Sequence, residues 1–324
     1  MTEPSTVPNT RKIIIDTDPG IDDAMAIFYA LASPELEVIG LTTIFGNAHT
    51  TVCTQNALRL LEIAGRPDIA VAEGAHRPLA MEFRGPADFV HGVDGQGNLH
   101  LPTPTTRPVA GSAAQFIVDQ VMANPGEITL VPIGPLTNIA LAMSLEPRLC
   151  ENLAGIVLMG GNAFGAGNAS PAAEANIIND PEAADIVFGA TCGVVMAGLD
   201  VTEATFMTGE QLERLGSVEN PRAEHVAAIM PFYLEFNRTE AGRDGIHVHD
   251  STVISYLIAP EHYRSVSMPV RVDCGHGVGR GKTWAAVERH RRGPWAGRPA
   301  VTILTEVDAD AVVRLELGRL GLTA

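Results

Sequence analysis

Short runs of apolar residues alternate along the chain with longer stretches in which apolar positions follow a helical spacing. The runs are almost entirely apolar, as expected for strands whose two faces are both covered by helices. Regular alternation of such strands with helices predicts an α/β protein with a mostly parallel, doubly wound sheet. The predicted strands are residues 12–15, 38–43, 128–132, 155–159 and 194–198, and the early helices are residues 23–32 and 51–64.

The last part of the chain has a different pattern, with three β-like runs before a closing helix. No linker rich in Ser, Gly or Pro separates it from the rest, so we expect a single domain over residues 12–324, with a mixed sheet flanked by helices. Residues 1–11 are polar with two prolines and are predicted to be a disordered tail. The late elements are predicted as strands 267–272, 283–287 and 300–307 and as helix 308–320.

Two stretches rich in Gly and Pro interrupt this alternation. Residues 82–108 show no clear periodicity, and structureless connections of this length in compact domains are usually lids or binding loops. Residues 160–171 directly follow a predicted strand. Because ligands of open α/β sheets bind outside the carboxyl ends of the strands, both stretches are candidates for the walls of a binding site.

Composition narrows the kinds of partner that this protein can have. The 324 residues include 22 Lys and Arg against 38 Asp and Glu, a net charge of −16. Nucleic-acid-binding surfaces are basic, so this balance argues against a nucleic-acid partner and leaves uncharged small molecules open. The four cysteines form no CxxC pair, the N-terminus lacks the apolar core of a secretory signal, and no apolar run is long enough to cross a membrane. We therefore expect a soluble cytoplasmic protein without a membrane partner.

The first predicted strand ends in a cluster of four aspartates, Asp16, Asp18, Asp22 and Asp23. Neighbouring carboxylates repel one another unless protons or a cation compensate their charge, and an all-oxygen set favours a hard cation such as Ca²⁺ or Mg²⁺. In a purely structural interpretation Asp22 is an N-cap and Asp23 a first-turn acid, which leaves Asp18 without a role. Haloacid dehalogenase-type phosphatases also begin with Asp-x-Asp after a strand. They have Thr or Val at the position of Gly20, so we rank this interpretation behind a metal site.

The same run, DTDPGIDDA, resembles the N-terminal signature of the inosine–uridine-preferring nucleoside hydrolases. The resemblance implies the nucleoside hydrolase fold, with a Rossmann-like core, and a hydrolase that cleaves N-glycosidic bonds in nucleoside salvage. It is less distinct over the last 70 residues, where residues 282–287 depart from the usual strand sequence. The further matching blocks are TTIFGN at 42–47, PIGPLTNIA at 132–140, VLMGG at 157–161, GNASPAAEANIINDPEAA at 167–184 and HVHD at 247–250.

The resemblance implies a bound Ca²⁺ with oxygen ligands from three parts of the chain. On this sequence the ligands are the carboxylates of Asp18, Asp23 and Asp250 and the backbone carbonyl of Ile133. The resemblance also implies short polar side chains that bind the ribose, although each of them alone would fit an ordinary turn or helix start. These side chains are Asp22, Asn47, Asn168, Glu174 and Asn176.

The reaction implied is hydrolysis of the ribosyl C1′–N bond of a purine or pyrimidine ribonucleoside to free base and ribose. Asp18 is expected to act as general base toward water, and His249 to protonate the departing base. His247 is expected near the base pocket and His91 in the lid. Because nucleoside hydrolases are commonly dimers or tetramers, the resemblance also implies a homo-oligomer.

Two alternatives stay open at this point. A relative that acts on a different or modified N-riboside would share the metal and ribose sites and differ in the base pocket, which we expect from residues 82–108 and 222–249. A protein of another class, a Ca²⁺-dependent ribose-binding protein without turnover, would require a damaged catalytic residue. Asp18 and His249 are both present, which argues against it.

Overall fold

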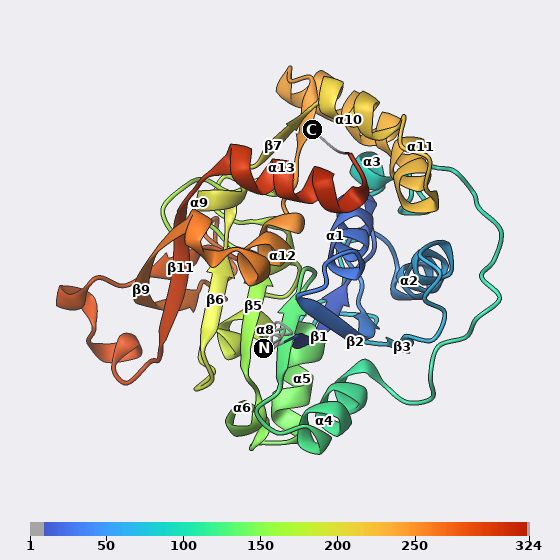
Figure 1. Ribbon diagram of the computed structural model, residues 1–324. Helices are drawn as coiled ribbons and strands as arrows, with labels where there is room; N and C mark the ends of the chain where they lie inside the picture. Colours follow the sequence, from blue (N-terminus) through green and yellow to red (C-terminus); the bar gives the residue numbers. More distant parts are fainter. Residues whose placement is uncertain (1–9, 323–324) are drawn as a thin grey trace, which may run out of the picture.

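One large sheet organises the part of the chain that the computed structural model describes, residues 10–322, and helices cover both of its faces (Figure 1). Within these residues the sheet has nine strands in the order β10-β9-β11-β6-β5-β4-β1-β2-β3. Neighbours from β11 to β3 are parallel, and β9 and β10 are antiparallel additions at one edge. The strands are β1 (Arg11–Thr17), β2 (Leu36–Thr43), β3 (Ala70–Glu73), β4 (Ile128–Pro132), β5 (Gly155–Met159), β6 (Val194–Ala197), β9 (Tyr263–Val272), β10 (Thr283–Ala285) and β11 (Ala300–Val307).

Burial on both faces accounts for strands that are apolar throughout. In β1, Ile13 and Ile15 belong to one hydrophobic core and the intervening Ile14 belongs to the other, and all three are fully buried. The first core is covered by α1 (Ile21–Leu31), α2 (Thr50–Ile63), α11 (Pro221–Phe236), α12 (Ser251–Ile258) and α13 (Ala309–Leu320). The second is covered by α4 (Ala113–Ala123), α5 (Thr137–Leu145), α6 (Leu149–Asn152) and α8 (Pro181–Val187).

Strand β1 is the point at which the winding of the sheet reverses. Strands β2 and β3 follow on one side of β1, whereas β4, β5 and β6 follow on the other. At such a switch point the connections leave toward opposite sides, and a crevice opens at the carboxyl ends of the strands. The aspartate cluster lies at this end of β1.

A long irregular connection between β3 and α4 reaches the same crevice. The predicted loop over residues 82–108 lies in it and contains one short helix, α3 (Asp88–His91). Two buried polar side chains hold the start of the connection: Asp180 accepts the N–H of Leu79 at 2.9 Å, and Asn138 accepts that of Ala75 at 3.0 Å. The following residues are thereby placed beside the strand ends.

The predicted strands and helices are present, with small shifts of their ends. Strand 283–287 is shorter than expected, and β1 begins at Arg11, inside the predicted tail, whose residues 1–9 lie outside the described part of the chain. Elements that the pattern did not reveal include β3, α11 and a small antiparallel sheet of β7 (Phe206–Thr208) and β8 (Gly245–His247). No helix within residues 10–322 is long and apolar enough to cross a bilayer. The four cysteines are free thiols.

Candidate active site

The aspartate-rich segment forms the turn between β1 and α1. Asp18 follows the last residue of β1, and Asp22 and Asp23 lie in the first turn of α1, whose N-cap is Gly20. Asp23 is a first-turn acid as the structural interpretation supposed, because its Oδ2 accepts the N–H of Gly20 at 3.0 Å. Its Oδ1 accepts the hydroxyl of Thr17 at 2.6 Å. Asp22 is not the N-cap, so that interpretation is wrong for it.

Asp250 brings another carboxylate to this turn from the far part of the chain. It is the N-cap of α12, and its carboxylate oxygen lies within 4.8 Å of one oxygen each of Asp22 and Asp23. Asp18 is buried beside them, and its Oδ2 accepts the N–H of Asn47 at 2.8 Å. The Oδ1 atoms of Asp18 and Asp22 are buried and have no hydrogen-bond partner within residues 10–322. Buried acceptors of this kind call for a donor or a cation.

Burial and mutual repulsion make these carboxyl groups weaker acids than an ordinary aspartate. Burial, followed by the charge of Asp23, raises the pKa of Asp18 well above its usual value. Burial raises the pKa of Asp22 to about 6, and burial followed by the charge of Asp22 raises the pKa of Asp23 to about 6. Burial, followed by the charges of Asp22 and Asp23, raises the pKa of Asp250 well above its usual value. A bound cation would offset this repulsion.

The first aspartate of the cluster has a different role. Asp16 lies within β1, where its Oδ1 accepts hydrogen bonds from Thr42 Oγ1 at 2.5 Å and from Asn138 Nδ2 at 2.8 Å. Burial raises its pKa to about 7, against the effect of these two donors. Asp16 therefore ties β1 to β2 and α5 below the crevice.

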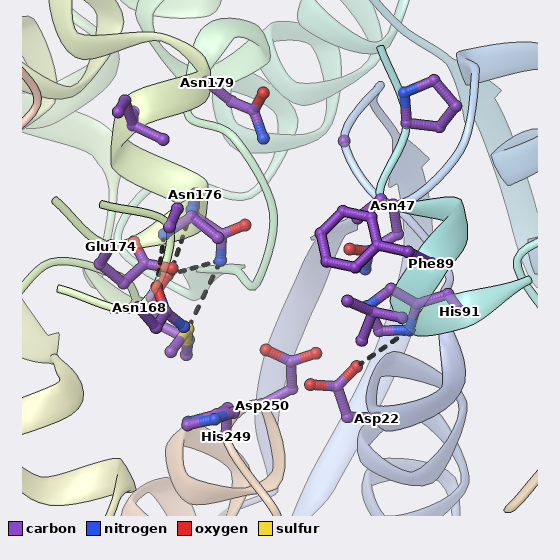
Figure 2. Close-up of a pocket in the computed structure, with 18 of the residues that line it drawn as sticks. Asp22, Asn47, Phe89, His91, Asn168, Glu174, Asn176, Asn179, His249 and Asp250 are labelled. Atoms are coloured by element: carbon purple, nitrogen blue, oxygen red, sulfur yellow. Dashed lines mark hydrogen bonds and ion pairs between the residues drawn. The ribbon is translucent and has the colours of Figure 1, made fainter. Parts of the chain in front are cut away.

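Polar side chains from the β5–α8 region form the opposite wall, as Figure 2 shows for Asn168, Glu174 and Asn176. Glu174 is the N-cap of α7 (Ala175–Asn179), and its carboxylate accepts the N–H groups of Gly161, Asn176 and Ile177 at 2.8–3.0 Å. Asn176 donates to the carbonyl of Ile133 at 2.9 Å. Asn168 accepts the first N–H of α7, that of Ala175, at 3.0 Å. These residues thus have the structural roles of caps and also face the carboxylates.

The loop that leads from β5 to Asn168 is held from two sides. Lys282 is nearly buried and donates from Nζ to the carbonyls of Asn162 at 2.6 Å and Gly165 at 2.8 Å. The carboxylate of Asp200, in α9 (Leu199–Thr202), accepts three consecutive N–H groups of residues 163–165 at 2.6–3.1 Å. Lys282, which fixes this loop, thus lies in the segment 282–287, where the sequence departs from the family pattern.

The three predicted histidines occupy different positions. His249 lines the cavity, and its Nδ1 lies 2.8 Å from the hydroxyl of Thr202. Burial, followed by the charges of His247 and His91, lowers the pKa of His249 to about 3. His91 is buried, which lowers its pKa to about 4, and it also lines the cavity. His247 stacks on His249 with ring centroids 5.5 Å apart but lies in a separate hollow, where Arg243 reaches its Nε2 at 2.9 Å.

These walls enclose a cavity of about 490 Å³. Asp18 and Asp23 lie behind its surface, and His247 lies outside it. The sequence did not single out the aromatic residues that complete the cavity, Phe89 of α3 and Tyr233 and Phe236 of α11, although their regions were expected to form the base pocket. The predicted residues that line it are Asp22, Asn47, His91, Ile133, Asn168, Glu174, Asn176, His249 and Asp250.

Comparisons with known proteins agree with this geometry. The family model described as inosine-uridine preferring nucleoside hydrolase matches residues 13–314. The chain is 46% identical to the probable uridine nucleosidase 2 of Arabidopsis thaliana, covering 96% of this chain and 97% of that protein. It is 40% identical to the pyrimidine-specific ribonucleoside hydrolase RihA of Shewanella woodyi, over 94% and 96% of the two chains.

Two solved structures extend the likeness to three dimensions. A plant nucleoside hydrolase, the PpNRh1 enzyme, superposes with a TM-score of 0.93 at 41% identity, covering 97% of this chain and 99% of that one. A purine-preferring ribonucleoside hydrolase from Gardnerella vaginalis superposes with a TM-score of 0.89 at 31% identity, over 96% and 98%. The fold and the arrangement of strands are therefore those of nucleoside hydrolases.

Proposed function

The chain belongs to the family of inosine-uridine preferring nucleoside hydrolases, and we propose that it is a calcium-dependent hydrolase of pyrimidine ribonucleosides with uridine as its preferred substrate. Hydrolysis of ribonucleosides is common to the family and to the relatives named above. The observation that carries the proposal is a single cavity in which buried carboxylates face short amide and carboxylate side chains. Its volume is within the usual range of small-molecule sites.

The donor set at the aspartate turn fits a hard cation. Asp18, Asp23 and Asp250 would supply carboxylate oxygens and Ile133 a carbonyl oxygen, which accepts one hydrogen bond from Asn176 and keeps a second lone pair. Ca²⁺ prefers oxygen ligands of these kinds. The buried Oδ1 of Asp18 accepts no hydrogen bond from residues 10–322, and a cation would satisfy it. When bound, the ion would hold the ribose hydroxyls and lower the pKa of its water.

The remaining chemistry falls to side chains of this chain. Asp18 accepts the proton of the attacking water, since its buried Oδ1 accepts no hydrogen bond from residues 10–322. The Thr202 hydroxyl lies 2.8 Å from Nδ1 of His249. In the tautomer in which this hydroxyl donates to Nδ1, the ring proton is on Nε2, where it can hydrogen-bond the departing base. With a pKa of about 3, the ring is neutral at pH 7, so this hydrogen bond is favoured over the full proton transfer expected from the sequence. The acidic walls stabilise positive charge on the ribose in an oxocarbenium-like transition state.

The base end of the cavity and the relatives support a pyrimidine. His91 accepts the N–H of Ile21 on Nδ1 at 3.2 Å, so its ring proton is on Nε2, where it can be donated to a carbonyl oxygen such as O2 of uracil. Tyr233 and Phe236 lie stacked with centroids 6.4 Å apart and offer aromatic surface to a base. Relatives named as uridine nucleosidases or pyrimidine-specific hydrolases are 39–46% identical to this chain, against 31% for the purine-preferring enzyme.

The test is release of reducing sugar from uridine, cytidine, inosine, adenosine and guanosine, each with Ca²⁺ and with a chelator. We expect ribose in the absence of phosphate, fastest from uridine, and loss of the reaction when Ca²⁺ is removed. Faster release from inosine or guanosine would overturn the pyrimidine assignment, and activity that survives chelation would overturn the calcium assignment. Ribose from none of the five would favour a modified N-riboside as substrate.

A further inference from the structure

One peptide group in the aspartate turn is held from both sides by side chains of a single loop, residues 91–97. The N–H of the Gly20–Ile21 peptide donates to His91 Nδ1 at 3.2 Å, and its C=O accepts from Gln96 Nε2 at 2.7 Å. The same C=O also accepts the N–H of Ala24 at 3.3 Å, at the start of α1. The N–H and C=O of a trans peptide point in opposite directions, so the helix and the two side chains together fix the plane of this peptide. Because it lies between Asp18 and Asp22 in the chain, its orientation determines how these two carboxylates are placed relative to each other.

The surroundings of Gln96 fix the orientation of its carboxamide. The side chain is only 2% exposed, and Nε2 faces two further carbonyls, those of Pro19 at 3.3 Å and Gly95 at 3.0 Å. Since acceptors alone surround Nε2, Oε1 faces His225, whose Nε2 donates to it at 2.8 Å. His225 belongs to α11, the helix that contributes Tyr233 to the cavity. One buried amide thus connects the aspartate turn, the loop of His91 and α11.

We propose that Gln96 is a positioning residue of this active site, which locks the Gly20–Ile21 peptide so that His91 keeps its proton on Nε2 and the aspartate turn keeps its shape. Gln96 does not line the cavity and acts through these neighbours. The proposal rests on the proposed function, because the reaction of the site is one of its readouts. Displacements of about 1 Å in a catalytic group can cost roughly 100-fold in rate, so a small relaxation of this turn is measurable.

The test compares Gln96→Met with Ser33→Ala in the full-length protein with Ca²⁺ present. Methionine keeps the volume of the side chain and removes its hydrogen bonds. Ser33 is buried near the opposite end of α1, where it donates to the carbonyl of Tyr29 at 2.7 Å, so its replacement removes a buried hydrogen bond away from the cavity. The readouts are kcat/KM for uridine and the ¹⁵N shifts of the His91 ring, identified by their absence in His91→Gln.

For Gln96→Met we expect kcat/KM to fall by about 10- to 100-fold and the His91 ring to change from one Nε2–H tautomer to a mixture. Ser33→Ala should change neither. A folded Gln96→Met protein that keeps its kcat/KM, or that loses activity while the His91 tautomer is unchanged, overturns the proposal.

A second variant decides the question if Gln96→Met does not fold. His225→Phe keeps an aromatic ring against Phe28, which it meets edge-on at 5.9 Å, and removes only the donor to Gln96. We expect a loss of roughly threefold to tenfold in kcat/KM, and no loss overturns the proposal. If the unsubstituted protein does not hydrolyse uridine, the proposed function fails, whereas the His91 shifts still test the positioning role.

Discussion

Asp18 and Asp22 each bury a carboxylate oxygen that accepts no hydrogen bond from residues 10–322. An unpaired buried acceptor costs roughly 1–3 kcal/mol, and more when it is charged. Asp23, in the same turn, differs because its two oxygens accept three hydrogen bonds, from Thr17, Gly20 and Asn47. The fold thus leaves one oxygen each of Asp18 and Asp22 without a donor, whereas Asp23 keeps only its remaining lone pairs for a cation.

Replacing Asp18 by Asn keeps the shape of the side chain and removes its charge and basicity. We expect Asp18→Asn to lower kcat for uridine by about 10²- to 10⁴-fold, the usual contribution of a general base. In the presence of chelator its melting temperature should be higher than that of the unsubstituted protein, because a mutual repulsion is lost. Steady-state kinetics and thermal unfolding check both. The control Asp68→Asn, which removes an exposed ion pair with Arg66, should change neither kcat nor the melting temperature. A melting temperature of Asp18→Asn in chelator below that of the unsubstituted protein would contradict the expected repulsion.

Replacing His249 by Ala tests assistance to the leaving base. His249→Ala should slow uridine, whose base leaves poorly, by about 10²-fold or more and should spare an activated p-nitrophenyl riboside. A comparison of kcat for the two substrates measures this difference. Equal losses on both would mean that His249 acts on the ribose or on the structure of the site and not on the base.

Several site residues could be predicted because they are neighbours in the sequence, as Asp22 and Asp23 are in one short motif. His247 was expected beside the base, yet its ring lies in the separate hollow with Arg243, although it does stack on His249. Gln96 could not be predicted, because a glutamine in a Gly-rich loop is ordinarily solvated. Its function depends on carbonyl groups that only the folded chain brings to it.

At the scale of elements, the buried parallel strands were predictable because a short, continuous apolar run bounded by turn residues is typical of a strand covered on both faces. The short strands β3, β7 and β8 have three or four residues each, too few for a periodic pattern. The helix α11 contains Pro231 in its interior, which signals a break in a sequence even though the structure continues the helix through it. Tyr233 and Phe236 of this helix were therefore not singled out, although their region was expected to contribute to the base pocket.

The loop that carries Asn168 provides a prediction about an element. Lys282→Met removes the two hydrogen bonds from Nζ to the carbonyls of Asn162 and Gly165, so the loop loses two of the bonds that hold it and keeps those of its N–H groups to Asp200. We expect KM for uridine to rise by about 5- to 20-fold, with a smaller change in kcat, since the proposed function assigns to this loop ribose binding and no reacting group. Arg291→Met, in an exposed ion pair with Glu288, is the matched control. A change in kcat alone would contradict this role of the loop.

At the scale of the whole molecule, residues as far apart in the sequence as Asp18 and Asp250 meet at the crevice beside β1, where the winding of the sheet reverses. The net charge of −16 and the acidic cavity disfavour anionic ligands. A nucleoside is neutral and a nucleotide is not, so we expect the net charge of the molecule to disfavour the binding of phosphorylated substrates. The acidic composition argues against a nucleic-acid partner for the same reason.

The raised pKa values of Asp22 and Asp23, about 6 each against an ordinary 3.8, predict how calcium and pH act together on stability. A carboxyl group with a raised pKa stabilises the folded state below its unfolded pKa, and this contribution is lost as the pH rises through about 6. Without Ca²⁺ these two groups therefore make the protein less stable at pH 8 than at pH 5. As a proposed Ca²⁺ ligand Asp23 must be ionised, and a cation beside Asp22 also favours the ionised form of that group. Ca²⁺ should therefore stabilise the protein mainly at the higher pH.

Thermal unfolding with Ca²⁺ and with chelator at the two pH values measures this. At 100 times the dissociation constant we expect Ca²⁺ to raise the melting temperature by about 5 °C at pH 8 and by much less at pH 5. An equal rise at both pH values would show that the ion binds elsewhere than among these carboxyl groups.

The double hold on the Gly20–Ile21 peptide also has a consequence for how the molecule is made. Its two partners come 70 and 76 residues later in the chain, and Gln96 in turn bonds a residue 129 positions further on. On the ribosome the aspartate turn therefore emerges before residues 91–97, which hold its peptide, and more than 200 further residues must be synthesised before Asp250 can join it. The active site is therefore assembled from segments that leave the ribosome at widely separated times, and it cannot mature until the segment with Asp250 has been made.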